Sequence, residues 1–544
     1  MPPFMQVQSL YASCLEMVFD SIYEAVQISS SDSIELWRKI VQSDLHSGIR
    51  EHLLQIATMY CRRNVYTLLD LLGVLLDKTT RKLDHSRGND DAWLPVEQCA
   101  AFFSRLDQCS ATGLQELTIK VRLHPRGMSE LEVVSRANPL FHRVLRNGLA
   151  SSLHSLVLCS ACDNETLRLL GRHSQNLRHL DVTSSWLVDD NGLRQLCFKD
   201  PELYAPPAYS EHAEGVMRTY LTLESNALNR CCETLQQVRI QDTNTSEVGV
   251  LMLLLFIPNL KSLGGFIYYR NVGDAILSLQ SAKPDLQLNL TDLWDTCLPP
   301  DKAAQLSRAV PHVTSLYTRG NYLPTVNLFC ALSALTIDFD FCDFRYELHE
   351  LLLQHGARLK KLVIVDQNHP LDISLLAELC PNLMELGAKL EGSWNQAGQL
   401  THLTSCRVRV GSREPFTSLL VNAPRLSHFE VSLEEESYGQ EIDMFLDSVM
   451  FQALCEADPP LECLTTFLMN SECYFGVHTV ELLMSRCPNL RLIGDLELWA
   501  GVTEKDVQDL ACEVRRRNLD LTLRYRGNWP AGRNSIQQIL QECQ

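Results

Sequence analysis

Residues 166–182 of this chain read TLRLLGRHSQNLRHLDV, and this stretch decides the fold. Leu167, Leu169 and Leu170 lie on one side of a short amphipathic helix, which a polar turn follows. The closing segment NLRHLDV then places Leu177, Leu180 and Val182 at the spacing of a short strand whose apolar side chains point inward. The stretch therefore predicts one helix and one strand that share a hydrophobic core.

The strand phrase Leu-x-x-Leu-x-aliphatic returns along most of the chain. Its copies begin near residues 114, 153, 177, 235, 260, 286, 313, 332, 359, 383, 403, 426, 461, 490 and 519. Most steps are roughly 19 to 29 residues, which is the period of leucine-rich repeats. The resemblance predicts an α/β solenoid over residues 96–525, with a parallel sheet on the concave face and helices outside.

Three segments lengthen the repeats and are predicted as inserts: residues 123–145, which add a helical stretch, and residues 199–231 and 433–460. The first part of residues 78–95 is charged and lacks an apolar period, so the segment is predicted as a linker. Residues 526–544 are predicted as a C-terminal cap or tail.

Composition limits the function classes. The 544 residues are 45% hydrophobic and 21% charged, with a formal net charge of −18. An acidic chain of this kind lacks the basic stripe with which a nucleic-acid-binding protein displaces counterions. The longest apolar run, residues 251–257, is too short to cross a bilayer, and no secretory signal opens the sequence. We therefore expect no nucleic-acid or membrane partner, reduced thiols, and a cytoplasmic or nuclear location.

No motif of a catalyst is present. The sequence lacks GxxxxGK[ST], GxGxxG, GxSxG and HExxH arrangements, and its one CxxC pair, Cys159 and Cys162, has no second pair to complete a zinc site. This pair follows a predicted strand, so a core position is the better interpretation. We expect neither metal nor cofactor, and a chain that is not itself an enzyme.

Residues 1–77 differ from the repeats and are predicted as all-helical, with helices near residues 10–25, 34–42, 49–60 and 65–76. In the first helix Leu10, Cys14, Val18, Ile22 and Ala25 recur at four-residue steps, which makes one apolar stripe on the helix. Ser9, Leu10, Cys14 and Val18 also match the pattern [Ser/Thr/Pro]-Leu-x-x-x-Cys-x-x-x-aliphatic. This pattern resembles the BC-box, a helix that binds elongin C. An ordinary helix that caps the solenoid stays open as an alternative.

A second pattern resembles the cullin-2 box that follows the BC-box in some of these proteins. Leu45, Ile49 and Leu53 keep its three aliphatic positions, but His46 stands where the family has proline. This departure puts the choice of cullin in doubt more than the contact with elongin.

A BC-box helix ahead of leucine-rich repeats resembles the Zyg-type substrate receptors of elongin BC–cullin ubiquitin ligases. The resemblance implies that the N-terminal helix binds elongin B/C, that residues 45–53 engage cullin-2, and that the repeats hold a protein substrate. The strand positions that we expect to face solvent, and hence the substrate, are Asp181, Arg239, Asp338, Arg407, Arg409 and Glu430.

Two alternatives keep the fold and change the function. Leu94-Pro95-Val96-Glu97, with Phe102 and Phe103, faintly resembles an F-box, which would connect the repeats to a different adaptor. Alternatively, the chain is a protein-interaction scaffold without a role in ubiquitin transfer.

Overall fold

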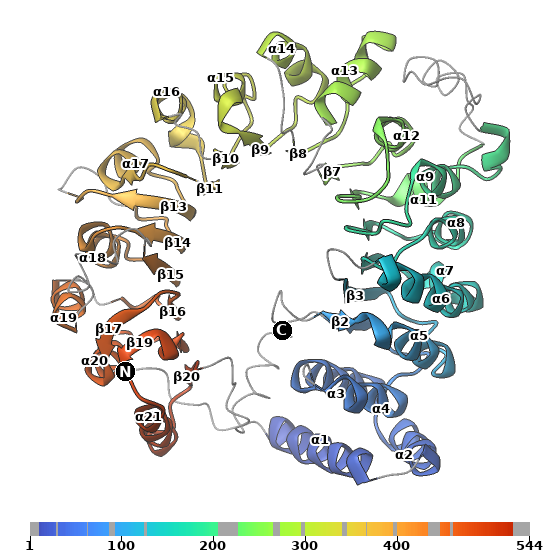
Figure 1. The fold of residues 1–544 in the computed structure, drawn as a ribbon, viewed down its shortest axis with the longest axis horizontal. Coiled ribbons are helices and arrows are strands. Elements are labelled where there is room, and N and C mark those ends of the chain that lie inside the picture. Colours follow the sequence, from blue (N-terminus) through green and yellow to red (C-terminus); the bar gives the residue numbers. More distant parts are fainter. Residues whose placement is uncertain are drawn as a thin grey trace. The chain divides into compact units, whose positions relative to one another are not determined.

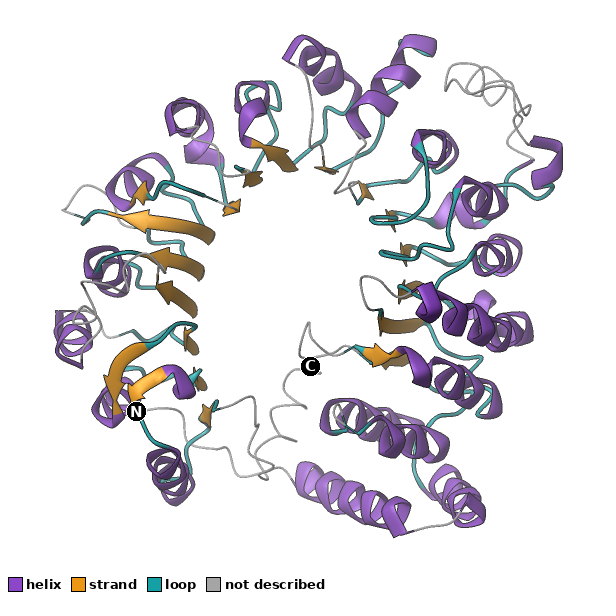
Figure 2. Ribbon diagram, in the orientation of Figure 1, coloured by secondary structure: helices purple, strands orange, loops and turns teal. Residues whose placement is uncertain are grey.

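The fold was analysed in a computed structural model of the whole chain. It describes residues 10–28, 31–61, 64–85, 93–123, 128–204, 227–264, 272–294, 300–339, 345–365, 367–394, 400–433, 447–456 and 461–525. These residues divide into two compact units, 10–313 and 314–525. In each unit the strands form a parallel sheet on the inner side of an arc and the helices cover its outer side (Figures 1 and 2). Both units therefore have the leucine-rich-repeat solenoid fold that the sequence predicts.

The first unit opens with four helices, α1 Leu10–Ile28, α2 Ser31–Asp44, α3 Ser47–Tyr60 and α4 Val65–Leu75. Helix α4 is buried over most of its length and packs against α1, α2, α3 and α5. Its nearly continuous apolar sequence places it at the centre of the segment, because each of its sides meets another helix. The all-helical N-terminal segment is thus present.

The sheet of the first unit is parallel throughout its described strands. Its strands are β1 Lys82–Asp84, β2 Leu94–Pro95, β3 Glu116–Arg122, β4 Ser155–Cys159, β5 His179–Asp181, β6 Gln237–Arg239, β7 Ser262–Leu263 and β8 Asp292–Trp294. The helices that cover it are α5 Cys99–Gln108, α6 Met128–Val144, α7 Ala150–Ser152, α8 Asn164–His173, α9 Asp190–Cys197, α11 Cys231–Thr234, α12 Glu247–Phe256, α13 Val272–Ala282 and α14 Pro300–Ala309.

The second unit repeats the pattern. Its strands are β9 Ser315–Arg319, β10 Ala334–Asp338, β11 Lys361–Val365, β12 Leu371–Asp372, β13 Glu385–Glu391, β14 Ser405–Val410, β15 His428–Leu433, β16 Thr466–Met469, β17 Cys473–Gly476, β18 Leu492–Gly494, β19 Trp499–Gly501 and β20 Thr522–Leu523. Of these, β17 and β19 pair with each other in a separate two-stranded parallel sheet. The helices are α15 Leu323–Val326, α16 Arg345–His355, α17 Ile373–Leu379, α18 Arg413–Asn422, α19 Asp447–Glu456, α20 Val477–Arg486 and α21 Glu504–Arg516.

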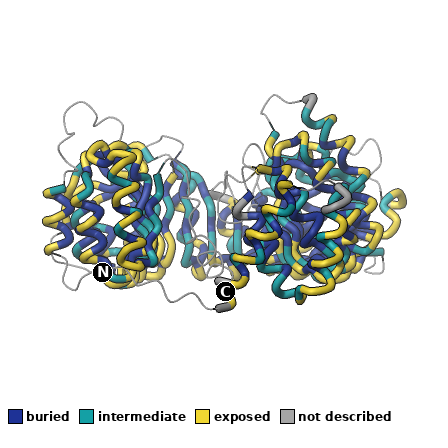
Figure 3. Tube along the Cα trace, turned by 90° about the horizontal axis from the view of Figure 1, so that it is seen from below, coloured by how far each residue is buried: buried dark blue, intermediate teal, exposed yellow. Residues whose placement is uncertain are grey.

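The repeat at residues 166–182 folds as predicted. Helix α8 contributes Leu167, Leu169 and Leu170 to the core, and each is at most 2% exposed. Leu177, Leu180 and Val182 are buried to the same degree at β5. Figure 3 shows the same alternation along the helices, where buried positions recur beside exposed ones. The hydrophobic core of each repeat therefore lies between its strand and its helix.

A side-chain clamp joins successive repeats at the Pro-Asn-Leu phrases. The amide Nδ2 of Asn382 donates to the carbonyl oxygen of Ala357 in the preceding turn at 2.8 Å. Asn259 and Asn489 make the equivalent bond at 2.7 Å, to the carbonyl oxygens of Glu233 and Glu462. These bonds satisfy turn carbonyls that the sheet does not reach, so the asparagine fixes the spacing of neighbouring repeats.

The predicted linker at residues 78–95 needs correction, because it contains two strands of the sheet. Strand β1 pairs in parallel with one part of β3, and β2 pairs with a later part of it. Leu83 and Leu94 are at most 1% exposed, so each supplies the single core residue of a very short strand. One apolar residue in a charged stretch gives no period, which is why the sequence did not reveal these strands.

The predicted inserts are described in part. Residues 128–144 form α6, which packs on α5 through Phe103 and Phe141, whose ring centroids lie 4.9 Å apart. Helix α6 thus serves as an ordinary helix of the array. Of the other two inserts, the structure describes residues 199–204 and 227–231 of the first, and residue 433 and α19 of the second. The remainder of both, and residues 526–544, lie outside the described residues.

Candidate functional site

Helix α1 is anchored by one face only. Its buried side chains are Leu15, Phe19, Ile22 and Val26, which are between 1% and 5% exposed. They recur at steps of three and four residues and so form one stripe on the helix. The stripe faces α3 and α4, the helices that α1 contacts most. On the opposite side of α1, Met17 is 70% exposed and Glu24 is exposed.

The buried stripe does not coincide with the apolar stripe of four-residue steps that the sequence shows. Of the positions Leu10, Cys14, Val18, Ile22 and Ala25, only Ile22 is buried, while Val18 and Ala25 are half-buried and Cys14 is exposed. The side chain of Leu10 and the whole of Ser9 lie outside the described residues. Large side chains occupy the buried stripe because they remove more apolar area from water than cysteine or alanine does.

Of the BC-box positions whose side chains the structure describes, Cys14 is exposed and Val18 is half-buried. At about 100° of turn per residue, the direction of Leu10, Cys14 and Val18 lies about 110° around the helix from the buried stripe. Met17, which is 70% exposed, lies on the same free face beside Cys14. The four-position pattern does not include Met17, but its place three residues after Cys14 could have indicated it.

Tyr11 connects this helix to α3. Its hydroxyl lies 2.7 Å from Nδ1 of His52, and the two rings meet edge to face with centroids 5.9 Å apart. Desolvation raises the pKa of the Tyr11 hydroxyl, so it stays neutral and is hydrogen-bonded to the imidazole. The bond fixes the first turn of α1 relative to the helix that holds the predicted cullin-box residues.

Those cullin-box residues are not equally accessible. Leu45 and Ile49 are half-buried, whereas Leu53 has no exposed surface and packs inside the helical segment. Leu53 therefore holds α3 in place and is out of a partner's reach in this fold. Only Leu45 and Ile49 present surface that another protein could contact.

His46, which replaces the proline of the family pattern, starts α3. Its φ of −60° and ψ of 146° are values that proline also adopts. Its Nδ1 accepts a hydrogen bond from the backbone N–H of Gly48 at 3.2 Å, so the imidazole caps the helix. The departure from the pattern thus keeps the backbone geometry at this position and adds a capping bond.

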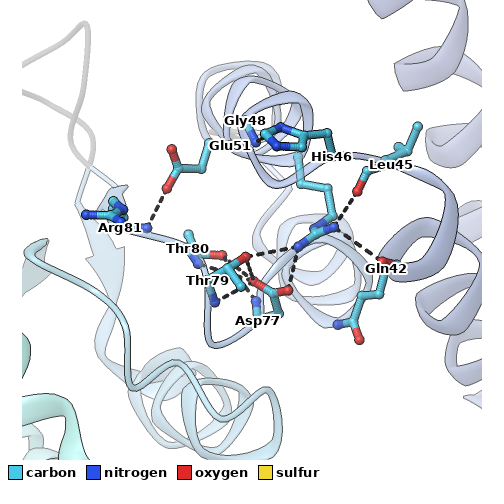
Figure 4. Close-up of polar contacts among 10 residues, drawn as sticks. Gln42, Leu45, His46, Gly48, Glu51, Asp77, Thr79, Thr80 and Arg81 are labelled. Carbon is cyan, nitrogen blue, oxygen red and sulfur yellow. Dashed lines mark hydrogen bonds and ion pairs between the residues drawn. The ribbon is translucent and has the colours of Figure 1, made fainter.

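A buried ion pair holds the helical segment on the first strand of the array (Figure 4). Nη2 of Arg50 on α3 lies 2.6 Å from Oδ2 of Asp77, which follows α4, and donates to Oγ1 of Thr79 at 3.0 Å. The guanidinium also donates to the carbonyl oxygen of Leu45. The side chains of Arg50 and Asp77 are only 7% and 14% exposed, so solvent screens the pair weakly.

The other carboxylate oxygen of Asp77 organises the turn toward β1. Oδ1 accepts from the backbone N–H and the hydroxyl of Thr79, at 2.9 and 2.7 Å, and from the N–H of Thr80 at 3.2 Å. Desolvation opposes ionisation of Asp77, but the hydrogen bonds from Thr79 and the charge of Arg50 outweigh it and lower the pKa. The helices and the first strand therefore meet at a joint with fixed geometry.

The strand-face residues of the first unit form a small ion pair. Asp181 on β5 is in register with Arg239 on β6, and Nη1 of Arg239 lies 3.6 Å from Oδ2 of Asp181. Arg239 is 58% exposed at its side chain, so the pair lies open to solvent.

In the second unit Arg407 and Glu430 are in register on β14 and β15, with Nε and Oε2 2.6 Å apart. The hydrogen bond that His428 donates, with those from Arg407 and Asn470, lowers the pKa of Glu430 to about 2 against the desolvation that would raise it. Asp338 on β10 accepts from the hydroxyl of Tyr317 at 3.0 Å. Arg409 is exposed. All six predicted positions therefore reach the strand face, divided between the two units.

The described residues hold no group of three or more histidine, cysteine or acidic side chains that could bind a metal ion. Cys159 and Cys162 are buried free thiols, and burial raises the pKa of the Cys159 thiol to about 12 and that of the Cys162 thiol well above its usual range. Thiols in this state are poor nucleophiles and poor ligands. None of the described helices is both long and apolar enough to cross a bilayer.

The segment that resembles an F-box is part of the repeat core. Leu94 lies on β2 and pairs with Val121 of β3, and Val96, Phe102 and Phe103 are at most 4% exposed. These apolar side chains are buried in the core of the chain's own first repeats, so they offer no surface to an adaptor.

Comparisons with known proteins add little to this description. Neither a protein-family model nor a curated protein sequence matches the chain. Among solved structures, a chain from the crystal structure of the Rad7 and Elc1 complex in yeast is 14% identical. The match covers 92% of this chain and 96% of that chain, with a TM-score of 0.38. A similarity at this level transfers neither function nor partner.

Proposed function

We propose that this chain is a substrate-recognition subunit of an elongin BC–cullin RING ubiquitin ligase. Helix α1 binds elongin C, and the leucine-rich repeats hold a protein substrate. The chain itself catalyses no step, because ubiquitin transfer belongs to the partner enzymes of such a ligase. It acts in the cytoplasm or the nucleus.

The one-sided burial of α1 carries this proposal. The helix packs on α3 and α4 by its Leu15 face, and Cys14 and Met17 stay open to a partner, since Cys14 is exposed and Met17 is 70% exposed. An amphipathic helix that presents apolar side chains on a free face is the usual form in which a helix enters a partner's groove. A small residue such as Cys14 between larger ones permits close approach of the partner's backbone.

Exposed apolar side chains are also frequent in the rest of the helical segment. Besides Met17 they include Tyr11, Leu36, Ile40 and Tyr66. Large apolar side chains left in water mark interaction surfaces more often than inert ones when they gather in one region.

The contact with a cullin rests on fewer residues than the motif implies. Leu45 and Ile49 remain for it at the start of α3, on a backbone that His46 holds in a proline-like conformation. Leu53 acts from inside the helical segment as a positioning residue. Cullin-2 is the partner that the family resemblance favours.

The test is co-purification with elongin B and C. Wild-type chain is expected to retain both, and a variant with Leu10→Gln and Cys14→Gln to lose them, because polar side chains cannot fill an apolar pocket. Gln27→Glu is the matched control, since Gln27 is exposed on another face of α1.

Three outcomes separate the alternatives. Retention of elongins that depends on Leu10 and Cys14 supports the proposal. Capture of a Skp-type adaptor in their place would favour the F-box hypothesis. Capture of neither, or elongin binding that is indifferent to the substitutions, would leave the scaffold hypothesis and exclude the proposed role of α1.

A further inference from the structure

Helices α20 and α21, the last two helices that the structure describes in the second unit, leave a cavity between them. Helix α18 packs on α19 and α19 packs on α20, but α20 and α21 are not among the described helix pairs in close contact. The cavity has a volume of about 320 Å³. Pockets that bind ligands have volumes of about 300 to 1,000 Å³, so this cavity is large enough for a bound group.

The floor of the cavity is apolar. It is lined by Met484 of α20, Leu510 of α21 and Leu519, which precedes β20. These three side chains are between 1% and 6% exposed. An apolar group that rests on them leaves water, which stabilises the bound state. The floor therefore suits an aliphatic or aromatic side chain of a ligand.

The rim of the cavity carries polar and charged side chains. Glu481 and Ser485 come from α20, whereas Glu513 and Arg517 come from α21 and the residue that ends it. The lining thus has two carboxylates and one guanidinium. We call the rim and the floor together the α20–α21 pocket, which consists of Glu481, Met484, Ser485, Leu510, Glu513, Arg517 and Leu519.

The two carboxylates of the rim differ in how they are held. Oε1 of Glu513 lies 2.6 Å from Nη2 of Arg516 and also contacts Nε of Arg517, so this carboxylate is already neutralised. Among the described residues, Glu481 has an ion-pair contact only with His478, at 3.9 Å, and both side chains are 63% exposed. The carboxylate of Glu481 is therefore open to a cation of a ligand.

We propose that the α20–α21 pocket binds a segment of a partner protein in which a large apolar side chain lies next to a lysine or an arginine. The apolar side chain enters the cavity and packs on the floor, and the basic side chain pairs with Glu481. A chain whose formal net charge is −18 also attracts a cationic segment. This surface lies on the helices of the second unit and does not depend on the proposed role of α1.

The experiment measures peptide binding to the full chain without elongins, by fluorescence anisotropy. The probe is a fluorescein-labelled peptide that carries two Leu-Lys pairs among serines. One comparison peptide replaces both leucines with serine, and the other replaces both lysines with glutamate. The Leu-Lys peptide should bind at least about tenfold more tightly than either, because each comparison removes one of the two contacts.

Two variants test the floor and the rim separately. Ser485→Trp places a large side chain at the exposed rim and should weaken binding by at least about tenfold, because it fills the space that the leucine needs. Glu481→Lys should weaken binding of the Leu-Lys peptide by a similar factor, because attraction becomes repulsion. The matched control is Glu462→Lys, since Glu462 is an exposed glutamate of the same unit that does not line the pocket.

Several results would overturn the proposal. Equal weakening by Glu481→Lys and Glu462→Lys, or equal binding of the peptide without leucine, would mean a general attraction between charges. Indifference to Ser485→Trp, an absence of binding, or preference for the glutamate peptide would each contradict the assigned contacts. Binding that appears only when the chain is shortened to end at Tyr525 would assign the pocket to the chain's own residues 526–544 in place of a partner.

Discussion

The ion pair between Arg50 and Asp77 makes a prediction that can be worked through from the structure. Replacing Arg50 with methionine keeps most of the volume and removes the charge, which leaves Asp77 buried with only its bonds from Thr79 and Thr80. Breaking one side of a buried pair costs about 3–5 kcal/mol. Because those remaining bonds still hold the carboxylate, we expect a loss of about 2–3 kcal/mol in the free energy of opening the helical segment.

Native-state hydrogen exchange is the suitable assay, because a repeat array opens locally and a single unfolding transition does not describe it. A loss of 2–3 kcal/mol corresponds to exchange about 30- to 150-fold faster at the protected amides of α3 and β1. The matched control is Arg136→Met on α6, which breaks an ion pair whose side chains are 80% and 71% exposed. That control should change exchange by about twofold at most.

An exchange rate of Arg50→Met within twofold of the wild-type rate would refute the reasoning, since the ion pair would then add no stability to the joint. Equal acceleration at amides of the distant helix α9 would also refute it, because the effect would not be local to the joint.

The remaining predictions concern the repeats. Asn382→Ala should lower the free energy of local opening by about 1 kcal/mol, measured by native-state hydrogen exchange at β11 and β13, because the turn carbonyl of Ala357 loses its donor; no change would mean that water replaces the clamp. Gly171→Ala should cost about 1–3 kcal/mol or prevent folding, because a Cβ there would lie 2.6 Å from the carbonyl oxygen of Leu196, and wild-type thermal stability would contradict this packing. The pKa of Glu430 is lowered to about 2, so its contribution to stability is present above its unfolded pKa of about 4.3 and is lost as pH falls toward 2. A Glu430→Gln variant should therefore lose part of the acid destabilisation seen in wild type below pH about 4.5, and an unchanged pH profile would contradict the assignment.

The repeats could be predicted from sequence because the same constraint recurs in each of them. Leu177, Leu180 and Val182 must all point inward from one short strand, and every repeat needs three such residues at the same spacing. The strand predicted at residues 286–290 is placed too early, because β8 of the structure begins at Asp292. Strand ends depend on backbone pairing, which the apolar pattern determines only approximately.

The buried face of α1 could not be predicted as well. Its sequence has apolar residues on several sides, so a four-residue step selected Leu10, Cys14 and Val18, while the fold buries Leu15 and Phe19. Which side is buried depends on the area that each side removes from water against α3 and α4. That information lies in the packing partners and not in the helix.

The ion pair at Arg50 could not be predicted from the sequence, for a related reason. Arg50 and Asp77 are separated by the whole of α4, and nothing in either local sequence indicates that they meet. A charged residue in an amphipathic helix is usually exposed, so burial of Arg50 follows only from the tertiary structure.

The affinity of the chain for purified elongin BC, measured by isothermal titration calorimetry, tests the central claim most directly. Wild type should bind, Cys14→Glu should weaken binding by at least about 100-fold because it places a charge in an apolar contact, and Gln27→Glu should match wild type. Equal affinity of wild type and Cys14→Glu, or no measurable binding by wild type, would contradict the assignment of the free face of α1 as the elongin-binding surface.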